Sequence, residues 1–159
     1  MKPASDKLKK PKVLLVDDDV SVIDALSGVL RDEGYDVIQA LNGHEAIQHF
    51  KAVGGTDIVL LDLNMPVKGG WDTFELLTTR NPLLPVIVIT ARPDQYVMAA
   101  AAGVAALMEK PLDIPVLLET MRKLLAEPLE TRLARIAGKN PQTLHIEAPA
   151  SAPNPTRRP

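Results

Sequence analysis

The side chains best suited to chemistry are three carboxylates, one hydroxyl and one ammonium group, which all follow short apolar runs. Asp17 and Asp18 follow the first run, Asp62 follows another, and Thr90 and Lys110 follow two later ones. Three carboxylates brought together repel one another, so one of them would tend to keep a proton unless a cation were bound. Clustered carboxylate and carbonyl oxygens suit a hard divalent ion such as Mg²⁺, which keeps coordination positions for water or phosphate oxygens.

The same groups are suited to phosphoryl transfer, which depends mainly on positioning and on stabilisation of charge. A carboxylate beside a bound cation can act as a nucleophile and form an aspartyl phosphate. The ammonium group of Lys110 could then pair with one phosphoryl oxygen, and the hydroxyl of Thr90 could donate to another. Backbone N–H groups after Asp62 could donate to the third oxygen.

Only the fold can bring these residues together, because they are spread from position 17 to position 110. Short runs rich in β-branched residues or leucine alternate with stretches in which apolar residues recur at helical spacing. The pattern predicts strands over residues 13–16, 37–40, 58–61, 86–89 and 105–108, and helices over residues 22–33, 42–53, 71–78, 94–102 and 113–126.

Strands that are apolar throughout are typical of a parallel sheet covered by helices on both faces. Right-handed crossovers then give an α/β fold, a doubly wound five-stranded parallel sheet with five helices. The functional site of such a sheet lies beyond the carboxyl ends of the strands, near the switch in strand order. Asp17, Asp62, Thr90 and Lys110 all follow those ends, so we expect them to meet.

Four short motifs together resemble the receiver domain of two-component response regulators. Each motif is weak alone, but all four in order and at the family's spacing are highly specific. They are Leu15-Val16-Asp17-Asp18, Leu61-Asp62-Leu63-Asn64-Met65-Pro66, Ile89-Thr90-Ala91 and Glu109-Lys110-Pro111. The resemblance covers residues 12 to about 126 and implies the flavodoxin-like (βα)5 fold. It also implies that Asp62 accepts a phosphoryl group from a phosphohistidine of a histidine kinase or phosphotransfer protein.

The resemblance further implies a magnesium cofactor, with Mn²⁺ as a possible substitute. Direct metal contacts are implied for Asp18, Asp62 and the backbone carbonyl of Asn64, whereas Asp17 would act largely through water. Thr90 and Lys110 would contact the phosphoryl group as described above. The peptide bond between Lys110 and Pro111 is cis in such domains.

One position departs from the family pattern. Three residues before the lysine the family usually has Tyr or Phe, whose ring turns inward when the threonine moves toward the phosphoryl group. Here that position is Leu107, which can change rotamer but has no ring. We therefore expect Thr90 and Leu107 to form the switch, with the coupling to output dependent on Leu107. The alternative is a constitutive protein-binding, receiver-like module that does not switch on phosphorylation.

Other residues have simpler interpretations. Asp19 is expected to cap the first helix, since Asp is favoured there, and Asn42 with Glu45 resembles a capping box. Trp71 and Phe74 are expected to be packing residues. A free-standing Mg²⁺ enzyme is disfavoured, because no histidine follows a strand and no second Asp lies two residues after Asp62. We expect catalysis only of the chain's own phosphorylation and dephosphorylation.

Charge and proline content divide the chain into segments. Residues 1–11 contain four lysines against one aspartate and form a basic N-terminal extension, whereas residues 12–126, the expected receiver domain, are acidic. Residues 127–138 have the pattern of a short amphipathic helix, with Pro near the start and Gly at the end. Residues 139–159 contain five of the 14 prolines and are expected to form a disordered tail.

These features also limit the partners that we expect. The net charge is only −2, and residues 127–159 cannot hold a helix-turn-helix reader, so no nucleic acid is expected. No apolar run approaches the roughly 18 residues of a membrane span, so no membrane contact is expected and the cytoplasm is the simplest compartment. The family uses the face formed by the fourth helix, fifth strand and fifth helix to contact an output protein or a second copy.

Overall fold

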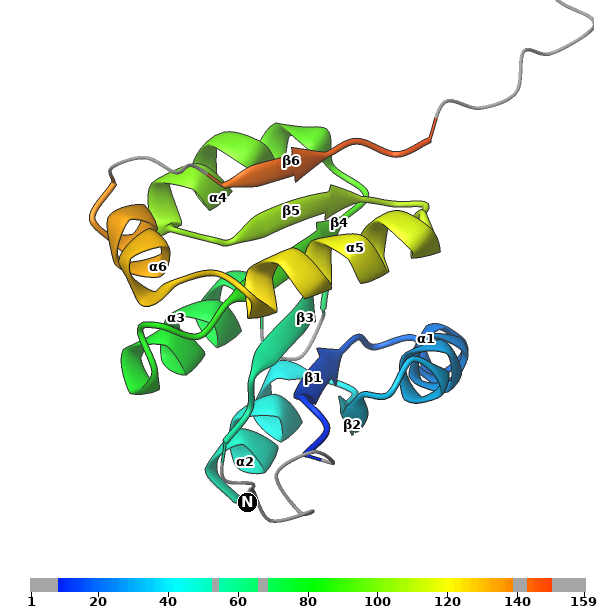
Figure 1. Cartoon of the computed structure of the whole chain (residues 1–159). Coiled ribbons are helices and arrows are strands. Elements are labelled where there is room, and N and C mark those ends of the chain that lie inside the picture. The colour runs from blue at the N-terminus through cyan, green and yellow to red at the C-terminus, as the bar shows by residue number, and fades with distance from the viewer. Residues whose placement is uncertain (1–8, 53–54, 66–68, 139–142, 150–159) are drawn as a thin grey trace, which may run out of the picture.

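The computed structural model describes residues 9–52, 55–65, 69–138 and 143–149, in which strands and helices alternate along most of the chain (Figure 1). The strands are β1 Lys12–Val16, β2 Asp36–Ala40, β3 Ile58–Asp62, β4 Val86–Thr90, β5 Ala106–Glu109 and β6 Leu144–Ile146. The α-helices are α1 Val20–Asp32, α2 Gly43–Ala52, α3 Gly70–Arg80, α4 Tyr96–Ala102, α5 Ile114–Leu125 and α6 Leu129–Ile136.

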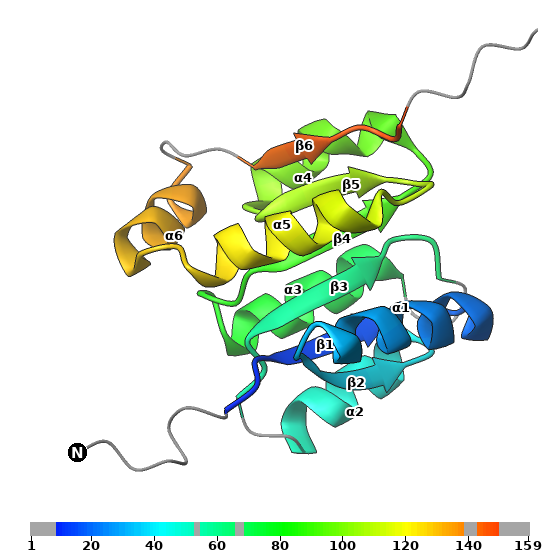
Figure 2. The same cartoon turned by 45° about the vertical axis from the view of Figure 1, so that its right-hand side comes forward.

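All neighbouring strands pair in parallel, and their order across the sheet is β2-β1-β3-β4-β5-β6 (Figure 2). The chain leaves β1 toward one side to form β2 and then crosses to the other side to form β3. The strand order therefore reverses at β1 and β3, where a doubly wound sheet places its site. The predicted doubly wound parallel sheet is confirmed.

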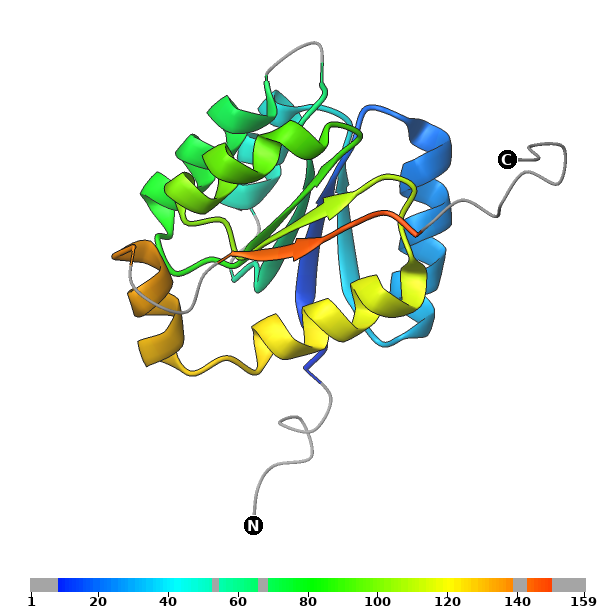
Figure 3. The same ribbon diagram turned by 90° about the horizontal axis from the view of Figure 1, so that it is seen from above.

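Helices cover both faces of the sheet, with α1 and α5 on one face and α2, α3 and α4 on the other (Figure 3). Successive side chains of a strand point to opposite faces, so Val13 and Leu15 of β1 pack in the core beneath α1 and α5. Leu14 and Val16 pack in the second core, beneath the other three helices. Every residue of β3 and β4 is buried, which explains why these strands are apolar up to their last residues, Asp62 and Thr90.

The first helices begin directly after side chains that accept hydrogen bonds from their first backbone N–H groups. The carboxylate of Asp19 accepts the backbone N–H groups of Ser21 and Val22, at 2.9 and 3.3 Å, so the predicted cap of α1 is confirmed. Asn42 Oδ1 accepts the N–H of Glu45 at 2.9 Å, as the capping-box pattern predicts. The segment before α4 differs from the prediction of one helix over 94–102, because a 3₁₀ turn over Pro93–Gln95 precedes the α-helix.

The described residues contain one strand and one α-helix more than the predicted five-stranded, five-helix domain. The sixth helix, α6, falls within the predicted 127–138 helix, but β6 lies in the segment that was expected to be a disordered tail. That expectation is wrong for residues 143–146, because the edge of β5 offers backbone partners that the local sequence does not reveal. The expected extension at 1–8 and the expected tail at 139–142 and 150–159 lie outside the described residues. No helix in the described part of the chain has the length and apolar character needed to cross a membrane.

Candidate functional site

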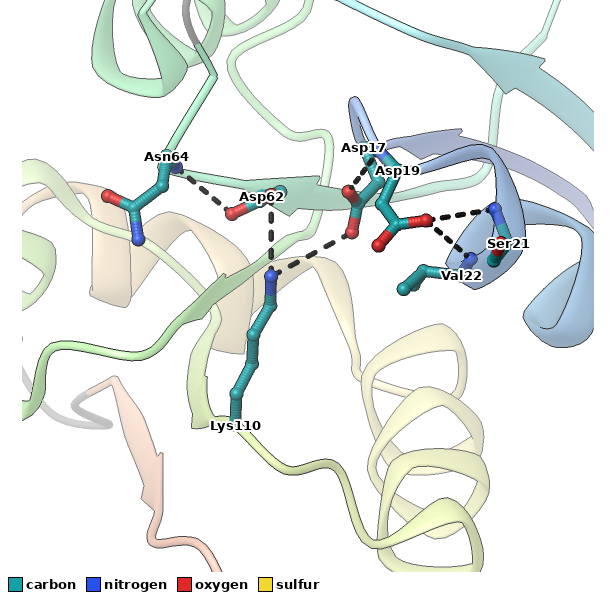
Figure 4. Close-up of polar contacts among 7 residues, drawn as sticks. All are labelled: Asp17, Asp19, Ser21, Val22, Asp62, Asn64 and Lys110. Atoms are coloured by element: carbon teal, nitrogen blue, oxygen red, sulfur yellow. Dashed lines mark hydrogen bonds and ion pairs between the residues drawn. The ribbon is translucent and has the colours of Figure 1, made fainter.

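The carboxyl ends of four strands meet at one edge of the sheet. Asp17 directly follows β1, Asp62 and Thr90 are the last residues of β3 and β4, and Lys110 directly follows β5. These strands are successive neighbours in the order β1-β3-β4-β5, so parallel pairing aligns their ends. Side chains separated by more than 40 positions thus come into contact, as between Asp62 and Lys110 (Figure 4).

Three carboxylates form the centre of this edge. Asp17, Asp18 and Asp62 each offer one oxygen, and these oxygens all lie within 4.8 Å of one another. Asp17 and Asp62 are only 3% and 2% exposed, whereas Asp18 is exposed and forms the solvent side of the cluster. This arrangement of oxygens is suited to a hard divalent cation that keeps water on its open side.

Burial and charge act together on Asp17. The pKa of Asp17 is raised from 3.8 to about 6, and burial is the largest cause. The backbone N–H of Asp19, which donates to Asp17 Oδ1 at 2.9 Å, opposes the rise. The negative charge of Asp62 also contributes to the raised pKa, the ammonium group of Lys110 lowers the pKa, and Asp18 contributes a smaller rise. The cluster therefore concentrates more negative charge than its own lysine offsets.

Lys110 provides the positively charged side chain of the site. Its Nζ lies 3.4 Å from Asp62 Oδ2 and 3.9 Å from Asp17 Oδ2 (Figure 4). The side chain is one-third exposed, so solvent still reaches the ammonium group. Its backbone N–H donates to the carbonyl of Thr90 at 2.8 Å, which links the ends of β4 and β5. The Lys110–Pro111 peptide bond is cis.

The segment after β3 orients the Asp62 carboxylate. The backbone N–H of Asn64 donates to Asp62 Oδ1 at 3.0 Å, while Oδ2 faces Lys110. The start of α3 lies directly against this segment: a Cβ added at Gly70 would lie 2.5 Å from Leu63 Cα and 2.9 Å from the Asp62 carbonyl oxygen. Only glycine allows α3 to begin so close to the site.

The two expected switch residues are both fully buried. The Thr90 hydroxyl accepts the N–H of Arg92 at 2.9 Å, which leaves its own proton available to another acceptor. No hydrogen bond joins this hydroxyl to the carboxylates in the part of the chain that the structure describes. Leu107 lies in the core beneath α2, α3 and α4, and the ring of Tyr96 packs against the same core.

Two groups of contacts near the site were not anticipated from the sequence. Trp71, at the start of α3, packs edge-on against Phe74 as expected, but its indole N–H also donates to Gln95 Oε1 at 3.0 Å. The imidazole of His145 stacks on Tyr96, and its Nε2 lies 2.6 Å from Glu109 Oε2. Both contacts join segments distant in sequence, and the short alternation around His145 is too brief to predict a strand.

Comparison with known proteins agrees with this geometry. The family described as "Response regulator receiver domain" matches residues 13–122. The chain belongs to this family. The resemblance of the four motifs is thereby confirmed, and receiver domains are phospho-acceptor signalling modules of two-component systems.

The relatives of this receiver domain include both longer proteins and single domains. The chain is 37% identical over 124 residues to transcriptional regulatory protein ZraR of Salmonella typhimurium, and the match spans 77% of this chain but only 28% of that protein. Response regulator TrrA of Thermotoga maritima, solved in complex with Mg²⁺-BeF, is similar with a TM-score of 0.66 and 27% identity, over 72% of this chain and 98% of that one. The CheX–CheY–BeF₃–Mg²⁺ complex of Borrelia burgdorferi matches with a TM-score of 0.70 and 26% identity, over 77% and 95% of the two chains.

Proposed function

We propose that this receiver domain takes up a phosphoryl group on Asp62 in a Mg²⁺-dependent reaction and thereby changes its contacts with a partner protein. One observation carries the proposal: an ammonium group lies 3.4 Å from a buried carboxylate that belongs to a three-carboxylate cluster. Carboxylate nucleophile, cation site and phosphate-pairing lysine are the parts that phosphoryl transfer to an aspartate requires. TrrA and CheY, which share the fold, were solved with Mg²⁺ and beryllium fluoride.

The donor set fits a hard divalent cation. All the side-chain groups are carboxylates, and the raised pKa of Asp17 supports a site in which negative charge is in excess. We assign Asp18, Asp62 and the backbone carbonyl of Asn64 to direct metal contacts and Asp17 to contacts largely through water. Mn²⁺ suits the same oxygens. When bound, the cation offsets the negative charge of the attacking carboxylate and of the phosphoryl oxygens.

The chain's own groups then have distinct roles in the transfer. One oxygen of Asp62 bonds to phosphorus while the phosphorus–nitrogen bond of a phosphohistidine breaks, and the released imidazole nitrogen takes up a proton. The N–H of Asn64, which donates to Asp62 Oδ1, orients the carboxylate. The ammonium group of Lys110 pairs with one phosphoryl oxygen, and the hydroxyl of Thr90 donates a hydrogen bond to another.

The phosphoryl donor needs a place to dock beside Asp62. A shallow, mainly apolar groove of about 310 Å³ adjoins Lys110 and runs between α1 and the segment after β5. Its apolar lining is formed by Val22, Ala25, Leu26, Pro111, Leu112 and Ile114. Apolar surface beside a charged site suits an amphipathic helix, so we assign this groove to the histidine kinase or phosphotransfer protein.

Output contacts are assigned to the face formed by α4, β5 and α5, with Thr90 and Leu107 as the switch. Leu107 is fully buried, so it can transmit a change only by repacking within the core. That burial, together with the missing ring, favours one alternative: a constitutive binding module that keeps the fold but does not switch. The alternative predicts equal affinity for a partner with and without phosphorylation.

The test is intact mass after incubation with Mg²⁺ and acetyl phosphate. We expect one added phosphoryl group on the wild type and none on Asp62→Asn. Asp24→Asn, an exposed carboxylate on α1, is the matched control and should be labelled like the wild type. An adduct that persists on Asp62→Asn would contradict the assignment. If a folded wild type accepts phosphate neither from acetyl phosphate nor from a cognate kinase, the constitutive module is the better description.

A further inference from the structure

The outer edge of β5 is occupied by a short strand from the C-terminal end of the same chain. β6 pairs in parallel with β5, with Leu144, His145 and Ile146 opposite Ala106, Leu107 and Met108. Without β6, the N–H and C=O groups on that side of β5 would form an open sheet edge, which is a template for another strand.

Side chains on the α4 side hold β6 in register. The buried hydroxyl of Thr143 donates to the carbonyl of Val104, and the Tyr96 hydroxyl donates to the carbonyl of Thr143 at 3.3 Å. The His145 ring stacks on Tyr96 with centroids 4.6 Å apart and planes 14° from parallel. His145 Nε2 also lies 2.6 Å from Glu109 Oε2. Alternate residues of the strand are thus recognised by specific partners.

The other side of β6 is loosely packed. Leu144 is 41% exposed, and a groove of about 380 Å³ separates β6 from α5. Only Ile146 contributes to the core beneath α1 and α5, as a partly buried residue. A strand of three residues with one loose side is at the low end of local stability, which makes its site accessible to a competitor.

We infer that the β5 edge, together with Tyr96 and Glu109, is a docking surface for an extended segment of a partner protein, and that β6 is its built-in competitor. Strand addition of this kind obtains affinity from backbone hydrogen bonds and specificity from alternate side chains. The segment that fits presents a hydroxyl residue, an apolar residue, an imidazole and a second apolar residue, parallel to β5. This deepens the assignment of output contacts to α4, β5 and α5 by naming the mode of binding.

The test uses the full chain and a labelled peptide of residues 143–149, Thr-Leu-His-Ile-Glu-Ala-Pro, followed by fluorescence anisotropy. Leu144→Pro removes the N–H that donates to the Ala105 carbonyl at 3.1 Å and disfavours the strand, so it opens the site. We expect saturable binding to Leu144→Pro and at least tenfold weaker binding to the wild type, whose tethered strand competes at millimolar effective concentration. The matched control Leu144→Ala keeps the N–H and should behave like the wild type.

Three results would overturn this docking site. The first is that the peptide binds the wild type and the Leu144→Pro chain equally well. The second is that a peptide with the same Leu→Pro change binds the Leu144→Pro chain as well as the original peptide does. The third is that no binding to folded Leu144→Pro is seen up to about 1 mM peptide. If Leu144→Pro does not fold, judged by circular dichroism, the double variant Thr143→Ala, His145→Ala replaces it with the same expectations. Docking needs no phosphorylation, so Mg²⁺ and phosphoryl donors are omitted. Failure here therefore leaves the proposed role of Asp62 untouched, and the reverse also holds.

Discussion

Asp17→Asn is expected to stabilise the folded chain in the absence of divalent cations. The Asp17 carboxylate is buried beside Asp62 and Asp18, and its pKa is raised from 3.8 to about 6. A raised pKa means that ionisation is less favourable in the folded state than in the unfolded chain. Asparagine removes the charge but keeps an oxygen that can accept the N–H of Asp19, which Asp17 Oδ1 now accepts at 2.9 Å.

The size of the effect follows from the pKa difference. A shift of about 2 pH units, at about 1.4 kcal/mol per unit, gives about 3 kcal/mol. The unfolded carboxyl ionises first as pH rises, so the wild type loses this stability between about pH 4 and pH 6 and lacks it fully above. The loss of the ion pair at 3.9 Å with Lys110 is already contained in this value, because the ammonium group is one of the groups that set the pKa of Asp17. The expected gain at pH 8 is therefore about 3 kcal/mol.

Urea unfolding followed by circular dichroism measures the gain, with EDTA present at pH 8 and at pH 4. Asp17→Asn should unfold at higher urea than the wild type at pH 8, and the difference should vanish at pH 4, where the wild-type carboxyl is protonated. Asp18→Asn serves as the control, because Asp18 is exposed and should give a smaller gain. A destabilised Asp17→Asn at pH 8 would refute the view that burial and like charge dominate at this position. Adding Mg²⁺ should raise the stability of the wild type more than that of Asp17→Asn, because ligand binding to the folded state stabilises it.

Three further outcomes are expected. Gly70→Ala should lower the free energy of unfolding, measured in urea, by about 2 kcal/mol, because the added Cβ would lie 2.5 Å from a backbone carbon after β3. Gly28→Ala is the control: its Cβ would meet nothing within 4 Å, and because Gly28 lies inside a helix the free energy of unfolding should rise by up to about 1 kcal/mol. The emission of Trp71, the single tryptophan, should change on phosphorylation because its N–H bonds to Gln95 in the segment after β4, and Gln95→Leu should suppress the change. Hydrogen exchange of the Leu144 amide should become faster on phosphorylation, since the side chains that hold β6 lie on segments that adjoin the site; unchanged protection would contradict the coupling.

The fold was largely predictable because its signals are local or periodic. Fully apolar runs indicate strands buried on both faces, and β3 and β4 are such strands. Asp19 marks the start of α1 by a hydrogen bond within three residues of itself. The grouping of Asp62 with Lys110 was predictable from topology, because the carboxyl ends of all the parallel strands in a sheet lie along one edge whatever their distance along the chain.

The missed features depend on contacts that no local pattern encodes. β6 is a three-residue strand in a Pro-containing segment, and its pairing is fixed by the free edge of β5 rather than by strand propensity. The partners of His145, which are Tyr96 and Glu109, come from two other elements. The 3₁₀ turn before α4 is a boundary effect of one turn, the scale on which helix limits are least certain.

Charge balance at the site connects it to the β5 edge. Three ionised carboxylates and one ammonium group leave two negative charges, which a divalent cation can neutralise. On the proposed function, a phosphoryl group on Asp62 would add about 1.5 to 2 negative charges, and the ammonium group of Lys110 and the hydroxyl of Thr90 are the donors that we assign to it. We expect movement of Lys110 to act on Glu109, its neighbour in sequence, and movement of Thr90 to act on the segment that leads to Tyr96. Glu109 and Tyr96 both contact His145, so we expect the added charge to weaken the hold on β6 and to make the proposed docking edge more accessible.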